Sequence, residues 1–544
     1  MTIVTDIEIV RQSGFNNIDA LLSSGPGWNF LGTGTRSLSY TFSVSSGNEA
    51  SRGGQAAFSM AQQMATRTAL SYITALTGIG FTETTDGSRA QIHMAAIDIA
   101  DTDTTGLCSW MTSYTPPSFG TTVRDFTAKA YVYLDNVEFR AENADLRPGG
   151  AGYETLLHEL GHMLGLKHPF DGDKKLPYDD DHTANTLMSY DPVGGPYQTY
   201  SPYDIAALNW LYGRDGLGGT YGVGASTPYY TGRDIAERLT GTYIGEVIEG
   251  AGGDDDIDGG AGIDMAYYVG PRANYDVTRI AAGYVVSDHA GDEGYDLLTN
   301  IETLHFSNGT VSLDYEAVVQ ALYVGYFGRA ADYNGMQSFQ SQLAALGAPR
   351  DMSALAAAYT KDAGLHALID SFAGSAESAA LYPGDTAAFV KGIFQNVFGR
   401  APAAAGLGFW TDAIDHQGLS KANASLSIMS GALANKTSQG LLDAKLINNK
   451  LAVASGFTLS IDTAAEVSGY GTKAAAASVR AMLDAVTAST DLSAYQSTIK
   501  ATLGAMSGAP RTTGDLPDAL HDDLPLTHAD LVGVGFQNWE PTLV

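Results

Sequence analysis

Hydrophobic and polar positions recur with two different periods over residues 1–235, which predicts a mixed α+β domain. The stretch TLLHELGHMLGLKHPF, residues 155–170, is predicted as one long helix. Residues 37–44 and 128–139 alternate or bunch β-forming residues and are predicted as strands. Another helix is predicted over 55–76, where apolar side chains recur near a 3.6-residue period: Phe58, Ala61, Ala65, Tyr72 and Leu76.

Glycine and aspartate dominate residues 245–275, with isolated apolar residues between them. Read nine residues at a time, 250–258 and 259–267 fit the repeat G-G-x-G-x-D-x-U-x, where U is apolar, and 241–249 keeps the register in degenerate form. This repeat is typical of calcium-binding parallel β-rolls. Because only two or three turns are predicted and solenoids usually need more, we expect this roll to depend on its neighbours.

From about residue 315 the chain becomes rich in alanine and leucine and is predicted to be helical. It also repeats itself: residues 322–339 match 393–410 with an offset of 71 residues. A weaker Ala-rich helical stretch covers 440–505, and residues 506–530 form a polar tail before an apolar end, PTLV. Three residue pairs anchor the repeat: Gly328 with Gly399, Arg329 with Arg400, and Gly335 with Gly406.

The predicted fold class is therefore multidomain: an α+β domain, a short parallel β-roll or β-sandwich, and an all-α C-terminal region. The predicted boundaries are 1–20 for a propeptide or N-terminal arm, 21–235 for the α+β domain, 236–315 for the roll, 316–430 for the two helical repeats, and 431–544 for an Ala-rich helical tail.

Charge narrows the classes of partner. Sixty acidic residues against 30 Lys and Arg give a net charge of −30, which disfavours nucleic acid or an anionic membrane and suits a binder of divalent cations. The sequence contains no run of 18 apolar residues, so no transmembrane helix is predicted. The N-terminus lacks the pattern of a Sec signal peptide. The single cysteine, Cys108, permits no intrachain disulfide, and its strand-like surroundings favour a buried thiol over a nucleophile.

Three histidines fall within eleven residues of the predicted helix 155–170. Residues four apart on an α-helix point the same way, so His158 and His162 can occupy two corners of a zinc tetrahedron. Glu159 lies between them and can reach a water molecule beside the metal without being a ligand. Gly165 can end the helix with a positive φ, after which His168 can return as third ligand. The open fourth position is typical of a catalytic zinc.

The alternative is a buried amphipathic helix whose histidines are satisfied by hydrogen bonds, which is the commoner situation for a lone histidine. Here five residues are fixed in the pattern H-E-x-x-H-x-x-G-x-x-H. Roughly 10⁻⁵ chance matches are expected in a chain of this length, so the metal site is the favoured interpretation.

A second motif, HTANTLMSYD at residues 182–191, places Met188 twenty residues after His168 and Tyr190 two residues further on. A zinc motif followed by such a methionine turn resembles the metzincin endopeptidases. The His168–Pro169 step, the LMSY turn and residues 201–213 resemble the serralysin family of secreted bacterial proteases.

The serralysin-like resemblance covers about residues 25–315 and implies a metzincin catalytic domain followed by a calcium-binding β-roll of the RTX type. Residues 295–313 resemble the segment that closes such rolls. The resemblance also implies that residues 128–139 are the edge strand that binds an extended peptide substrate by β-augmentation.

By this resemblance, Glu159 would take a proton from zinc-bound water and pass it to the leaving amine. Tyr190 would be a metal ligand in the resting enzyme or a donor to the oxyanion, with a core tyrosine as the alternative. Met188 would form a hydrophobic floor under the zinc site. The zinc ligands would be His158, His162 and His168.

In the roll, Asp255 and Asp264 occupy the sixth position of their nonapeptides. With backbone carbonyls of the Gly-rich turns they would form an all-oxygen Ca²⁺ site, with a solvated acidic loop as the alternative.

The second helical repeat, FGRAPAAAGLGFW at 398–410, resembles a bacterial helical domain of unknown function that is found in secreted and cell-surface proteins. The first copy departs from the pattern at Ala331 and Phe339. Arg329 and Arg400 are better explained by packing of a helix–loop corner than by ligand binding. The resemblance implies attachment or targeting outside the cell.

Taken together, the sequence predicts a zinc endopeptidase that acts on protein or peptide substrates. Export by type I secretion through a C-terminal signal would lead to an extracellular or cell-surface location, with a surface-layer protein as one expected substrate. The alternative is a calcium-dependent surface or S-layer-associated binding protein in which the protease fold is ancillary.

Overall fold

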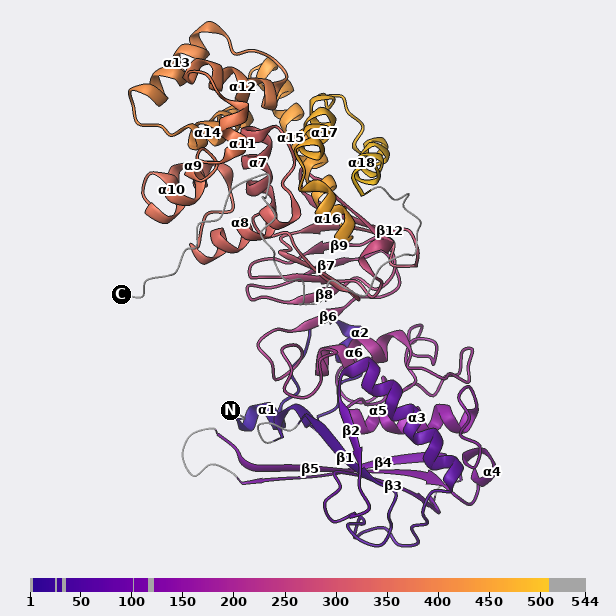
Figure 1. Cartoon of the computed structure of the whole chain (residues 1–544). Coiled ribbons are helices and arrows are strands. Elements are labelled where there is room, and N and C mark those ends of the chain that lie inside the picture. The colour runs from indigo at the N-terminus through magenta and orange to yellow at the C-terminus, as the bar shows by residue number, and fades with distance from the viewer. Residues whose placement is uncertain (1–2, 25–26, 32–35, 101, 116–121, 508–544) are drawn as a thin grey trace. The chain divides into compact units, whose positions relative to one another are not determined.

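The computed structural model describes residues 3–24, 27–31, 36–100, 102–115 and 122–507 (Figure 1). The chain divides into two compact units, Met1–Gly252 and Gly253–Val544. The predicted multidomain architecture, with α+β structure followed by a helical C-terminal region, is confirmed. No helix in the described ranges is both long and apolar enough to cross a bilayer. The expected secretion signal at the apolar C-terminus lies outside the described residues.

The first unit is built on a five-stranded sheet with the order β2-β1-β3-β5-β4. All neighbouring strands are parallel except β4, which pairs antiparallel with β5 at one edge. The strands are β1 Ser37–Thr41, β2 Gly80–Glu83, β3 Ile92–Ile97, β4 Gly106–Thr115 and β5 Arg124–Asp135.

The edge strand differs from the prediction. We expected residues 128–139 at the edge, but β5 lies between β3 and β4, and its last six residues are all buried. The edge is formed by β4, which contains Cys108 as predicted for a strand. The expectation, which came from the family resemblance, was wrong because the antiparallel pairing of β4 with β5 covers that side of β5.

Helices α3, α5 and α6 pack together in the first unit, and α5 contacts β4 and β5 (Figure 1). The helices of this unit are α1 Val4–Glu8, α2 Asn16–Asp19, α3 Met60–Thr77, α4 Arg140–Asn143, α5 Ala151–Leu164 and α6 Pro202–Tyr212.

Helix α3 begins later than predicted because Ser59 caps it. The Ser59 side chain accepts from the backbone of Gln62, and the Gln62 side chain accepts from the backbone of Ser59. The buried face also differs from the predicted apolar positions and consists of Thr66, Ala69, Leu70, Ile73 and Thr77.

Five three-residue strands begin at nine-residue intervals in the region predicted as a roll. Two of them end the nonapeptides 232–240 and 241–249, in which glutamates replace the sixth-position aspartate. One of these, Glu246, is fully buried and accepts a hydrogen bond from Thr242 N at 3.1 Å. The strands are β6 Tyr229–Thr231, β7 Arg238–Thr240, β8 Val247–Glu249, β9 Asp256–Asp258 and β10 Met265–Tyr267.

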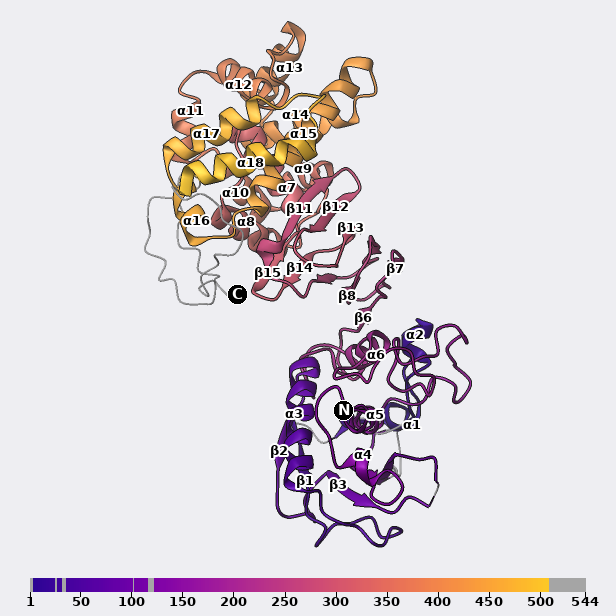
Figure 2. The same ribbon diagram turned by 90° about the vertical axis from the view of Figure 1, so that its right-hand side faces the viewer.

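The second unit continues with longer strands that pair in the orders β11-β12-β13-β9 and β10-β14-β15. Helices α15 and α18 lie against β11, where Lys500 Nζ and Asp276 Oδ2 are 3.0 Å apart (Figure 2). The strands are β11 Tyr275–Ile280, β12 Gly283–Asp288, β13 Tyr295–Thr299, β14 Thr303–Phe306 and β15 Gly309–Ser312.

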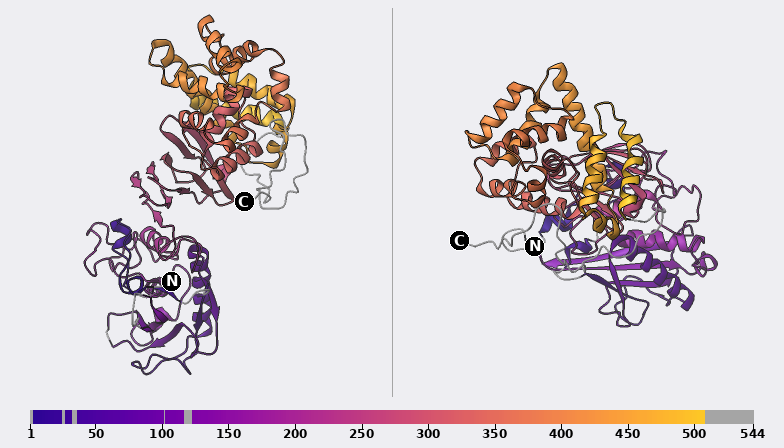
Figure 3. Two further views of the ribbon diagram at one scale, coloured as in Figure 1. Left: turned by 90° about the vertical axis from the view of Figure 1, so that its left-hand side faces the viewer. Right: turned by 45° about the horizontal axis from the view of Figure 1, so that its top comes forward.

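The helices of the second unit gather around one apolar core, to which α7 and α15 both contribute many buried residues (Figure 3). They are α7 Glu316–Phe327, α8 Tyr333–Ala345, α9 Met352–Tyr359, α10 Ala363–Asp370, α11 Ala376–Leu381, α12 Thr386–Phe398, α13 Ala404–Asp415, α14 Lys421–Ala434, α15 Ser438–Leu459, α16 Ala464–Tyr470, α17 Lys473–Asp484 and α18 Leu492–Ser507.

The two sequence repeats form matching helix–glycine–helix corners, α7–α8 and α12–α13. Gly328 and Gly399 end the first helix of each with φ of 66° and 61°. The corner arginines differ: Arg329 is 1% exposed and bonds both oxygens of Glu377, whereas Arg400 is 42% exposed and pairs with Asp443. Both are held in ion pairs within the fold.

Candidate metal centre

Helix α5 carries the first two histidines and ends at Gly165, whose φ is 102°. Leu166 N donates to Gly161 O and Gly165 N donates to His162 O, each at 3.0 Å, which is the Schellman pattern. Aromatic side chains satisfy the last carbonyls: Trp110 Nε1 donates to His162 O at 3.2 Å and Trp28 Nε1 to Met163 O at 2.8 Å. The chain therefore reverses at a fixed position, as the glycine predicted.

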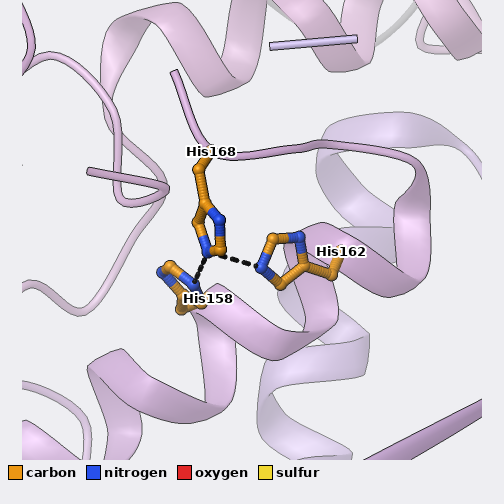
Figure 4. Close-up of side chains that lie close together, drawn as sticks. All are labelled: His158, His162 and His168. Atoms are coloured by element: carbon orange, nitrogen blue, oxygen red, sulfur yellow. Dashed lines mark hydrogen bonds between the residues drawn. The ribbon is translucent and has the colours of Figure 1, made fainter. Parts of the chain in front are cut away.

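This reversal brings the third histidine back over the helix (Figure 4). Nε2 of His168 lies 3.3 Å from Nε2 of His158 and 3.1 Å from Nε2 of His162. A tetrahedral zinc ion with Zn–N of about 2.0–2.1 Å separates its ligand nitrogens by about 3.3 Å, so the three histidines fit zinc.

The opposite ring nitrogens all have acceptors. His158 Nδ1 lies 2.7 Å from Leu187 O, and His162 Nδ1 lies 2.9 Å from Leu166 O. Because a carbonyl oxygen can only accept, these Nδ1 atoms carry the protons, and each neutral ring directs an Nε2 lone pair into the centre. His168 Nδ1 makes the equivalent contact with Asp171 Oδ2 at 3.0 Å.

Burial keeps the first two rings neutral. Desolvation lowers the pKa of His158 to about 3 and that of His162 to about 4, from an ordinary value of 6.5. At neutral pH the Nε2 lone pairs of these two rings therefore face His168 Nε2 at little more than 3 Å, an arrangement that a bound cation relieves.

The carboxyl group of Glu159 is buried beside the histidines, with 5% of the residue exposed. Within the described residues its Oε2 atom has no hydrogen-bond partner. Burial raises its pKa from 4.5 to about 8. Strand β4 passes so close that a Cβ on Gly106 would lie 2.8 Å from Glu159 Oε1. Glycine at this position leaves room for the carboxyl group.

The tyrosine of the methionine turn also reaches the histidines. Tyr190 Oη lies 2.9 Å from His168 Nε2, and 67% of Tyr190 is exposed. This exposure argues against the alternative of a core tyrosine. Met188 is fully buried, and a Cβ on Gly161 would lie 2.7 Å from its Sδ, so the second glycine of the helix lets the methionine pack beneath it.

Asp204 is a residue of this centre that the sequence analysis missed. It is fully buried in α6 and accepts from Thr186 Oγ1 at 2.6 Å, Leu187 N at 2.8 Å and Ser201 N at 3.1 Å. Because the Leu187 carbonyl holds His158, Asp204 fixes the orientation of a predicted ligand. The capping box formed by Ser201 and Asp204 is visible in the sequence, but its contact with the methionine turn is not.

The aspartates predicted to bind calcium lie in the second unit. Asp255 and Asp264 are 3% and 1% exposed, and their backbone N atoms bond Asp296 Oδ1 and Glu302 Oε2. Burial, followed by repulsion from Asp255, raises the pKa of Asp296 to about 7. Carboxylate oxygens are the ligand type that calcium prefers, so Asp255 and Asp264 stay predicted ligands. They are remote in sequence from the histidines and form a separate candidate site.

Comparison with known proteins finds serralysins. The chain is 28% identical over 274 residues to a serralysin of Photorhabdus laumondii subsp. laumondii, covering 44% of this chain and 53% of that protein. It is 28% identical over 277 residues to serralysin G of Dickeya chrysanthemi, covering 44% and 54%. It is 26% identical over 314 residues to the metalloprotease AprA of Pseudomonas entomophila, covering 51% and 62%.

The chain thus spans about half the length of the curated relatives it matches. A family model described as "Domain of unknown function (DUF4214)" matches residues 369–436 and includes the second helical repeat. Both resemblances predicted from the sequence, to serralysin-like metzincins and to a helical domain of unknown function, are confirmed.

Replacing Asp204 by alanine is expected to destabilise the protein and weaken zinc binding. Three buried donors lose their acceptor, at about 1–3 kcal/mol each, so the free energy of unfolding should fall by about 3 kcal/mol or more. Urea denaturation and zinc competition titrations measure both effects. Asp191→Ala removes an exposed carboxylate nearby and is the matched control. Wild-type stability and zinc affinity in Asp204→Ala would contradict this role.

Replacing Glu159 by glutamine is expected to stabilise the metal-free protein increasingly as pH rises. The folded-state pKa of about 8 exceeds the ordinary 4.5, so between these values the folded wild type holds a proton that the unfolded chain releases. Wild-type stability therefore falls as pH rises through this window, by at most about 1.4 kcal/mol per pH unit, and the glutamine variant lacks that loss. Thermal unfolding in excess chelator at pH 5, 6, 7 and 8 measures it. A difference in melting temperature that does not change with pH contradicts it.

Proposed function

We propose that this chain is a secreted zinc-dependent endopeptidase of the serralysin type. The observation that carries the proposal is the convergence of three imidazole Nε2 atoms, two of them 3.1 and 3.3 Å from the third, beside the buried carboxyl group of Glu159. The similarity to serralysins supports the same activity. In this proposal His158, His162 and His168 are the zinc ligands.

Zinc, when bound, supplies a positive charge that polarises the scissile carbonyl and lowers the pKa of a water molecule to about 7. Glu159 takes one proton from the attacking water as the new C–O bond forms. The same carboxyl group passes that proton to the amine nitrogen as the C–N bond breaks. Burial alone holds the pKa of Glu159 at about 8. To act as a base at neutral pH, Glu159 therefore needs a hydrogen-bond donor or a positive charge beside it that stabilises the ionised carboxylate.

Two further groups are assigned to the reaction. Tyr190, with its hydroxyl 2.9 Å from His168 Nε2, can donate to the carbonyl oxygen as negative charge develops there. Edge strand β4 lies beside α5 and offers its free edge to an extended peptide substrate. β4 takes the place in this proposal that the sequence had assigned to residues 128–139.

For the roll we propose structural calcium at Asp255 and Asp264. Calcium is scarce in the cytosol and abundant outside cells, so ion binding can delay folding until after export. The proposed route is type I secretion, and the proposed substrates are proteins or peptides, including a bacterial surface-layer protein. We also propose a role in attachment for the helical part of the second unit, which contains the match to the domain of unknown function.

Hydrolysis of casein by the full chain tests the proposed activity. We expect cleavage by the zinc-loaded protein, loss of cleavage in a zinc chelator, and recovery when zinc is restored. Glu159→Ala should lower kcat by at least about 10²-fold, because general acid–base catalysis contributes about 10²–10⁴-fold. Glu138→Ala, an exposed glutamate in the same unit, should cleave normally. No cleavage of any protein by zinc-loaded wild type overturns the proposed function.

Calcium is expected to stabilise the second unit through Asp255 and Asp264. At about 100 times its dissociation constant, calcium should add about 2.7 kcal/mol to the free energy of unfolding. Differential scanning calorimetry with and without calcium measures the shift. The double variant Asp255→Ala, Asp264→Ala should lose it, and Asp292→Ala, an exposed aspartate, should keep it. Equal shifts in both variants would show that these aspartates do not bind the ion.

A further inference from the structure

The segment that carries the third histidine is paired with a segment far away in the sequence, Ala20–Ser23, which we call the N-terminal strap. Leu22 and Leu166 form an antiparallel bridge. Lys167 N donates to Leu21 O at 2.7 Å, and Ser23 N donates to Gly165 O at 2.9 Å. The strap residues Ala20, Leu21 and Leu22 are all buried. The strap thus holds the backbone between the end of α5 and His168.

The side chain of Lys167 ties the strap to the following loop. Its Nζ donates to Ala20 O, to Asp171 O at 2.7 Å and to Lys174 O at 3.0 Å, with His168 O at 3.4 Å. All four acceptors are backbone carbonyls. An ammonium group is suited to this place because it has three donors and no acceptor, so it can join several carbonyls that cannot bond one another.

One of these carbonyls belongs to a residue that contacts the metal centre with its side chain. Asp171, whose backbone oxygen accepts from Lys167, places its own Oδ2 3.0 Å from His168 Nδ1. That contact directs His168 Nε2 toward the other two histidines. Groups that orient a metal-bound histidine through its second nitrogen typically change metal affinity 10–100-fold when they are removed.

We propose that Lys167 is a positioning residue of the metal centre: its ammonium fixes the loop between His168 and Lys174 to the N-terminal strap and so sets the orientation of His168. The proposal rests on the zinc site of the proposed function. It extends the site to the first strap residue, Ala20, whose carbonyl would be lost if residues 1–20 were removed as a propeptide. The N-terminus of a mature form that keeps this contact lies at or before Ala20.

The test uses the full-length protein and two readouts that need no peptide cleavage. Zinc affinity is measured by competition with a chromophoric chelator, and ligand geometry by the visible absorption of the cobalt-substituted protein. Lys167→Met should bind zinc about 10–100-fold more weakly and change the cobalt spectrum. Lys167→Arg, which keeps several N–H donors, should recover part of the affinity. Lys174→Met removes an exposed ammonium from the same loop and should match wild type.

A double-mutant cycle separates positioning of His168 from a general effect on folding. In the His168→Ala background, Lys167→Met should cause no further loss of zinc affinity, because the side chain it positions is absent. An equal loss in both backgrounds overturns the proposal, as does a Lys167→Met protein with wild-type affinity and spectrum. Lys167→Gln replaces the methionine variant if circular dichroism shows that the latter is unfolded.

The outcomes also distinguish this proposal from the proposed function. If Lys167→Met weakens zinc binding through His168 but the zinc-loaded wild type cleaves no protein, positioning stands and the protease assignment fails. If the wild type cleaves protein and Lys167→Met binds zinc normally, the protease assignment stands and the positioning role of Lys167 fails.

Discussion

The structure of the first unit depends on one electrostatic constraint: three imidazole lone pairs must converge on one point inside the protein. The Nδ1 atom of each ring contacts an oxygen on the side away from this point. These oxygens are Leu187 O for His158, Leu166 O for His162 and Asp171 Oδ2 for His168. Burial keeps His158 and His162 neutral. Without a cation the arrangement is unfavourable, and with one it becomes a source of stability.

Several elements of the unit satisfy this constraint. The Schellman turn at Gly165 reverses the chain, and Trp28 and Trp110 cover the last carbonyls of α5. Asp204 anchors the methionine turn whose Leu187 carbonyl orients His158. The N-terminal strap and Lys167 hold the loop that carries His168. Residues as far apart in the sequence as Ala20 and Asp204 thus help to place the three histidine side chains.

The sequence predicted the elements whose information is local. The H-E-x-x-H spacing determines which residues share a helix face, and Gly165 indicates where the helix ends. The apolar period predicted a helix from residue 55, whereas the capping pair Ser59 and Gln62 begins α3 at Met60. Strands β6 and β7 were missed because Pro228 and Glu237 stand where the repeat has its aspartate.

The remaining features arise from contacts between residues far apart in the chain. The edge position of β4 is a property of sheet order, which a run of β-formers does not encode. Asp204 lies 17 residues from Leu187, and Lys167 lies 147 residues from Ala20. Neither partner can be inferred from spacing, since each contact exists only after the unit has folded around α5.

X-ray absorption spectroscopy of the purified full-length protein at the zinc edge tests the central claim most directly. The account predicts one zinc per chain, with a first shell of three imidazole nitrogens at about 2.0–2.1 Å and oxygen in the remaining coordination. A protein that binds no zinc at neutral pH, or a shell whose imidazole contribution is unchanged in His158→Ala, contradicts it.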